Sequence, residues 1–80
     1  MSHGNTELRK ITRGIHFARS GEGRRVRVSA GVSQAAVAKA VGVSPAAVAH
    51  WETRHRTPQG DRAARYCDVI TLLSRELEAR

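Results

Sequence analysis

The side chains of this sequence that could do chemistry are mainly cations and hydrogen-bond donors. Fourteen Lys and Arg oppose seven Asp and Glu in 80 residues, a net charge of +7. Up to Arg65 the sequence holds twelve basic and four acidic residues, a net +8, whereas from Tyr66 onward it holds two basic and three acidic ones. Such a concentration of positive charge favours contact with phosphates. A solvated basic surface is the alternative interpretation of the charge alone.

No group of residues in the sequence predicts catalysis or metal binding. There is no Ser, His and Asp set, no glycine-rich phosphate loop, and residues 21–23, GEG, are too few to form one. His3 and His16 have no second ligand at useful spacing, and the single Cys67 has no partner for a disulfide or a zinc site. We therefore expect no catalytic residue, no cofactor, no metal and no small-molecule ligand.

The composition fits one small domain. Apolar residues make up 40% of the chain, enough for a small core, and none of their runs is long enough to span a membrane. Residues 1–10 are polar and show no secretory signal, and an unpaired Cys67 fits a reducing compartment. We expect a cytoplasmic protein without a membrane partner.

The elements that must position the polar groups are organised around residues 34–53, QAAVAKAVGVSPAAVAHWET. Gly42 is expected to end a first helix in the left-handed conformation. Ser44 and Pro45 are expected to open a second helix, as N-cap and first helical residue. Ala38 is small where two such helices would cross closely. The angle between the helices would be filled by Val37, Val41, Val43, Val48 and Trp51. The pattern predicts a helix-turn-helix.

From about residue 23 to residue 75 the sequence resembles the Xre/Cro/C1-type helix-turn-helix proteins of bacteria and their phages. Besides the motif, the resemblance rests on Arg27, on residues 31–34 (GVSQ), on residues 51–52 (WE) and on Pro58. It implies an all-α, compact five-helix lambda-repressor-like domain with a central helix-turn-helix and an additional N-terminal helix. It also implies a double-stranded DNA operator as partner, in the bacterial cytoplasm, and a Cro-like regulator or minimal repressor that acts by operator occupancy.

The second helix of the motif should enter the major groove with its N-terminal end leading. A period of 3.6 residues turns Val48 and Trp51 inward. The outward residues, which we expect to contact DNA, are Ser44, Pro45, Ala46, Ala49, His50 and Thr53. Ala and Pro can contact thymine methyls and His50 can donate to guanine, so direct readout of bases is expected to be thin. Sequence preference would then depend on few bases, on DNA shape, or on arms outside the motif. An exposed His50 without a DNA contact is the alternative.

Further contacts to phosphates are expected from residues around these readers. In the family, the Gln that matches Gln34 hydrogen-bonds a phosphate, and the free N–H groups at that helix start help. The basic candidates are Arg24, Arg25, Lys39, Arg54 and Arg56. The family has Gly where this chain has Arg54, and a left-handed Arg is strained. The helix is therefore expected either to run on by half a turn or to end differently.

The resemblance also implies a structural ion pair between Arg27 and Glu52. In the family an Arg at the matching position pairs with the Glu that follows the conserved hydrophobic residue of the recognition helix. A buried charge that loses its partner costs about 3–5 kcal/mol. We expect the pair to hold the fold together rather than to contact DNA.

The segments that flank the motif are expected to be helical. Residues 1–5 should be disordered and residues 6–80 should form one domain. A first helix over residues 6–20 would carry an apolar stripe, which consists of Leu8, Ile11, Ile15 and Ala18. Phe17 lies nearly opposite this stripe, so it packs within the monomer or contacts a second subunit. Val28, in a helix from Glu22 to about Gly31, would pack on this first helix.

The last helix, from Gly60 or Asp61 onward, is apolar over a wide face. Its apolar residues are Ala63, Tyr66, Cys67, Val69, Ile70, Leu72, Leu73 and Leu77. One face of this helix packs on the motif. The remaining apolar residues either belong to the core or form the contact of a homodimer that binds two half-sites. Two other functions remain open from the sequence. One is the antitoxin of a toxin–antitoxin pair, and the other is a protein-interaction module with a vestigial helix-turn-helix.

Overall fold

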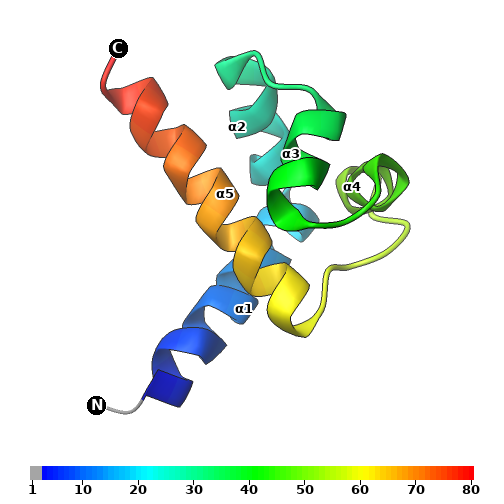
Figure 1. Ribbon diagram of the computed structural model, residues 1–80, viewed down its shortest axis with the longest axis vertical. Coiled ribbons are helices and arrows are strands. Elements are labelled where there is room, and N and C mark those ends of the chain that lie inside the picture. Colours follow the sequence, from blue (N-terminus) through cyan, green and yellow to red (C-terminus); the bar gives the residue numbers. More distant parts are fainter. Residues whose placement is uncertain (1–2) are drawn as a thin grey trace.

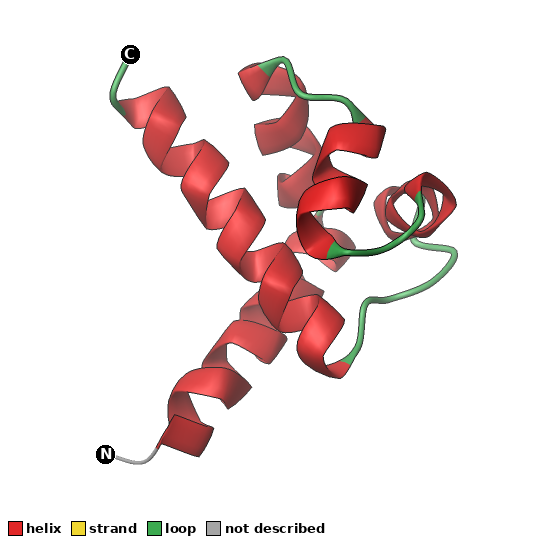
Figure 2. Ribbon diagram, in the orientation of Figure 1, coloured by secondary structure: helices red, strands yellow, loops and turns green. Residues whose placement is uncertain are grey.

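The structure is a computed structural model that describes residues 3–80 as five α-helices (Figure 1). The helices are α1 (His3–Ser20), α2 (Glu22–Ala30), α3 (Gln34–Val41), α4 (Pro45–Glu52) and α5 (Gly60–Glu78). The described residues contain no strand, and short loops join the helices (Figure 2). The predicted all-α, five-helix architecture is confirmed. None of the helices in residues 3–80 is both long and apolar enough for a membrane span.

The helix ends of the motif follow from the residues predicted for them. The Ser33 hydroxyl accepts the Ala36 N–H at 3.0 Å at the start of α3, and the Ser44 hydroxyl accepts the Ala47 N–H at 3.2 Å at the start of α4. Gly42 ends α3 with φ +90°, in the left-handed region where a side chain would be strained. Two capped helices of eight residues are thereby held at a short turn.

The helix α4 ends at Glu52, without the half-turn extension that was one expectation. Arg54 adopts φ +63°, a left-handed conformation that Gly adopts without strain. The Arg54 N–H donates to the Trp51 carbonyl at 3.3 Å and the His55 N–H donates to the His50 carbonyl at 2.9 Å. These two bonds form a Schellman motif. The chain thus keeps the glycine-type helix end although a left-handed Arg costs about 1–2 kcal/mol.

All five helices contribute buried residues to the core. Its largest members are Trp51 and Tyr66, whose rings pack edge to face with centroids 5.2 Å apart. Burial raises the pKa of the Tyr66 hydroxyl to about 12, so this group stays neutral at physiological pH. The other buried apolar residues include Val26, Val37, Ala38, Val41, Val48, Ala63, Cys67 and Ile70. The inward positions predicted for the motif are therefore confirmed, with Val43 partly buried at the edge.

The first helix differs most from its prediction. It begins at His3, so residues 3–5, which were expected to be disordered, are helical; residues 1–2 lie outside the described residues. Leu8 of the predicted inward stripe is 61% exposed, whereas Phe17 is buried in the core. Of the two alternatives for Phe17, packing within the monomer is therefore confirmed. Figure 1 shows the reason, because α1 crosses α5 at a steep angle and its N-terminal half extends beyond the crossing.

Gly14 is the residue at which α1 and α5 cross. A Cβ atom there would overlap the Ala63 carbonyl oxygen and lie 2.7 Å from the Ala63 carbonyl carbon. Because Gly14 has no side chain, the backbones of α1 and α5 can approach closely, although a Gly weakens an isolated helix.

Val28 of α2, which was expected to pack on α1, is 51% exposed.

Candidate nucleic-acid interface

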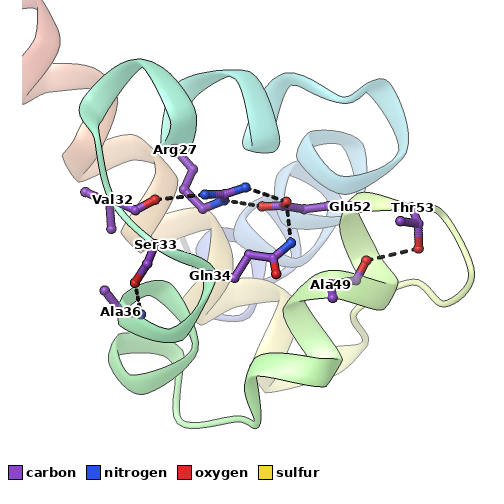
Figure 3. A network of polar contacts seen from close by, with 8 residues as sticks. All are labelled: Arg27, Val32, Ser33, Gln34, Ala36, Ala49, Glu52 and Thr53. Carbon is purple, nitrogen blue, oxygen red and sulfur yellow. Dashed lines mark hydrogen bonds and ion pairs between the residues drawn. The ribbon is translucent and has the colours of Figure 1, made fainter.

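A polar network joins α2, α3 and α4 beneath the recognition helix (Figure 3). The Nε and Nη2 atoms of Arg27 donate to the two carboxylate oxygens of Glu52, at 2.5 and 2.8 Å. The Nη1 atom of Arg27 donates to the Val32 carbonyl at 2.8 Å, and the Gln34 amide donates to Glu52 at 3.0 Å. The predicted Arg27–Glu52 pair is present, and it fixes the C-terminal end of α4 against two other helices.

The electrostatics of the pair follow from its burial. The Glu52 side chain is 3% exposed and the Arg27 side chain 12% exposed. Burial by itself would raise the pKa of the Glu52 carboxyl, but hydrogen bonds from Arg27 and Gln34 and the Arg27 charge lower this pKa below its ordinary value. The hydrogen bond to Glu52 raises the pKa of Arg27 despite its burial. Both groups are therefore charged in the fold, and each needs the other.

Gln34 lies at the start of α3, as predicted, but its side chain is turned inward. Its amide nitrogen donates to Glu52 and the residue is half-buried. The nitrogen carries a second N–H besides the one donated to Glu52. The phosphate contact of Gln34 stays a prediction.

The outer face of α4 presents the predicted readers. Ser44, Pro45, Ala46, His50 and Thr53 are exposed, and Ala49 is half-buried. Two of the hydroxyls already have partners within the protein. The Ser44 oxygen caps α4. Figure 3 shows the Thr53 hydroxyl, which donates to the Ala49 carbonyl at 3.0 Å. The imidazole of His50 is left as the main side-chain donor on this face.

A groove runs beside α4, between the N-terminal end of this helix, the loop after it and the first turn of α5. The predicted residues that line it are Ser44, Ala46, His50 and Arg56. The imidazole rings of His50 and His55 stack in it, with centroids 5.9 Å apart and planes 28° apart. His55, which belongs with Arg54 and Arg56 to a basic cluster after the motif, also lines the groove. Arg62 lines it too and was not assigned to the site from the sequence; its signal was a cation early in the last helix.

The remaining predicted cations lie elsewhere. Arg24 and Arg25 on α2 and Lys39 on α3 are exposed but do not line the groove. Arg54, expected to contact phosphates, is exposed, and its Nε donates to the Arg19 carbonyl at the end of α1, 2.9 Å away. This bond draws the Arg54 side chain toward a helix end 35 residues earlier in the chain. The phosphate contact of Arg54 stays a prediction.

The comparisons agree with this geometry. A family model described as helix-turn-helix, of the Cro/C1 type, matches residues 24–76, which is more than half of the chain. The match runs from α2 through α3 and α4 into α5 and leaves α1 outside. No curated protein and no solved structure matches the chain. Residues 3–80 hold no group of three His, Cys, Asp or Glu side chains that could bind a metal ion. The chain belongs to the Cro/C1-type helix-turn-helix family of DNA-binding transcription regulators.

Proposed function

We propose that this protein is a sequence-specific regulator of the Cro-like or minimal-repressor kind, which acts by occupying a double-stranded DNA operator in the bacterial cytoplasm. The observation that carries the proposal is the exposed face of α4. It holds His50 and small apolar residues beside a groove with Arg56 and Arg62. A buried network fixes this helix from behind, so its orientation does not have to be set by the DNA.

The division of labour follows from the residue types. Arg56 and Arg62 contact phosphates and set the position of the protein, as do Arg24, Arg25 and Lys39 on the neighbouring helices. Pro45 and Ala46, at the leading end of α4, contact thymine methyl groups. His50 donates to the N7 or O6 atom of a guanine. Specificity therefore depends on few base pairs and on the shape of the DNA between them.

The test of this function is selection of bound duplexes from a random pool of DNA. We expect a short enriched sequence that contains at least one G·C pair opposite His50. If the enriched sequence is an inverted repeat with half-sites about one helical turn apart, the protein binds DNA as a homodimer. A pool that shows no enriched sequence after repeated selection would overturn sequence-specific binding.

A second candidate is an antitoxin that also binds a protein. It is favoured by Leu72 on α5, which is 57% exposed beside the partly buried Val69 and Leu73. The same face would serve a homodimer contact. Co-purification separates the two functions, since an antitoxin should retain a second, different protein whereas a homodimer covers Leu72 with a second copy of this chain.

Replacement of His50 by Ala is expected to weaken binding to the selected site by about 1–3 kcal/mol. Binding to random DNA should change little, because base contacts specify whereas phosphate contacts hold. Arg56→Ala is the matched control, which should weaken binding to both duplexes to the same extent. Binding curves for the two variants on both duplexes give the comparison. An equal loss on both duplexes for His50→Ala would show that this residue reads no base.

A further inference from the structure

We propose that Arg54 is a positioning residue, which fastens the end of the recognition helix to the C-terminal end of α1 and thereby orients His50 and His55 in the groove. The inference rests on the proposed sequence-specific binding, but the contact itself can be tested without DNA. It gives Arg54 a role different from the phosphate contact expected from its charge.

The backbone of Arg54 supplies the first observation. It is the one residue other than Gly with a positive φ in residues 3–80. The Schellman motif at this helix end would form more easily with Gly, which has no Cβ to strain. Strain of this kind persists where the surroundings hold the residue in place. The side chain of Arg54 must therefore contribute something that Gly would not.

The second observation is what the side chain contacts. Its Nε donates to the carbonyl of Arg19, one of the last carbonyls of α1, which have no partner within the helix. A cation is favourable at this end of a helix because the helix dipole is negative there. Gly21 is the first residue after α1, and a Cβ atom on it would lie 3.0 Å from the Arg54 Nη2 atom. The missing side chain of Gly21, itself at φ +82°, leaves space for the guanidinium.

The third observation links this contact to the groove. Within the turn that holds Arg54, the N–H groups of His55 and Arg56 both donate to the His50 carbonyl, at 2.9 and 3.2 Å. The His55 ring stacks on the His50 ring. Any shift of Arg54 is passed to these groups through the same turn. Arg54 thereby connects α1, which lies outside the segment that matches the family, to the residues that line the groove.

The test compares Arg54→Gly with Arg56→Ala, which removes a neighbouring exposed cation without a contact to α1. Arg54→Gly stays folded because Gly adopts the left-handed conformation without strain. We expect about a three- to ten-fold loss on the selected site, comparable to one hydrogen bond, with less than about a two-fold loss on random DNA and an unchanged salt slope. Arg56→Ala should weaken binding to both duplexes and reduce the slope of the salt dependence by about one. An Arg54→Gly profile like that of Arg56→Ala would overturn the proposal.

An NMR measurement on the free protein tests the contact apart from DNA. The Nε–H of Arg54 should exchange with water more slowly than that of Arg56, and the Arg54→Gly variant should shift the amide signals of Ser20 and Gly21. An Arg54 Nε–H that exchanges as fast as that of Arg56 would overturn the proposal. If the Nε–H is protected but selection finds no preferred sequence, the contact stands and the proposed function fails.

Discussion

Replacement of Glu52 by Ala is expected to lower the free energy of unfolding by about 3–5 kcal/mol, because it leaves the Arg27 guanidinium buried without its carboxylate. Arg27 donates two hydrogen bonds to Glu52, and a third comes from Gln34. The loss would be a large part of the stability of a small domain. Urea unfolding, monitored by the fluorescence of the buried Trp51, measures it.

The matched control is Asp68→Ala. Asp68 pairs with Lys10 at 3.3 Å on the surface, with side chains 56% and 41% exposed, and such exposed pairs contribute about 0–1 kcal/mol. A Glu52→Ala variant no less stable than Asp68→Ala would mean that the carboxylate is solvated and that the network does not hold α4. Replacement of Arg27 and Glu52 together by apolar residues should restore much of the loss, since no charge is then left unpaired.

The same pair sets an acid limit on stability. The pKa of Glu52 is lower in the fold than in the unfolded chain, so the unfolded chain binds a proton first as the pH falls. The stabilisation from Glu52 is therefore fully present above the ordinary carboxyl pKa and is lost as the pH falls through the lower pKa of the folded protein. Glu52→Gln should show a smaller loss of stability over this acidic range than the parent protein.

Replacement of Gly14 by Ala is expected to destabilise the protein by about 1–3 kcal/mol or more, although Ala favours an isolated helix by about 1 kcal/mol. The added Cβ would meet the backbone of Ala63, which cannot rotate away as a side chain can. The helices α1 and α5 would have to separate, and Phe17 and Ala18 would lose contacts in the core. Thermal unfolding of the variant measures the effect.

His16→Ala provides the comparison within the same helix. His16 is exposed, so this change should be neutral or slightly stabilising, as the helix propensity of Ala predicts. If Gly14→Ala also stabilised the protein, the close crossing of α1 and α5 at this residue would be refuted.

Local sequence rules predicted the centre of the fold better than its periphery. Ser33, Ser44 and Gly42 act on backbone groups within a few residues, so their types indicated where α3 and α4 begin and end. In the predicted stripe of α1, Ala18 is buried and Ile11 and Ile15 are half-buried, but Leu8 is exposed, because the face that a helix buries depends on its partner. Here the partner is α5, about 50 residues away, and α1 meets it at Gly14. Phe17, three residues further on, is therefore buried as well.

The candidate site shows the same division. The resemblance to the family predicted the Arg27–Glu52 pair, and the helical period predicted that His50 faces outward. The directions of the Gln34 and Arg54 side chains could not be predicted. Their directions are set by hydrogen-bond acceptors 18 and 35 residues away in the chain. Only folding brings these acceptors close to the two side chains.

Direct measurement of DNA binding over a salt series tests the central claim, that α4 and the cations around it form a sequence-specific DNA interface. With about four to six phosphates neutralised per subunit, the logarithm of the association constant should fall linearly with the logarithm of salt concentration, with a slope between about −3.6 and −5.4. The selected site should bind more tightly than random DNA at every salt concentration. A flat salt response, or equal affinity for the two duplexes throughout, would contradict the account.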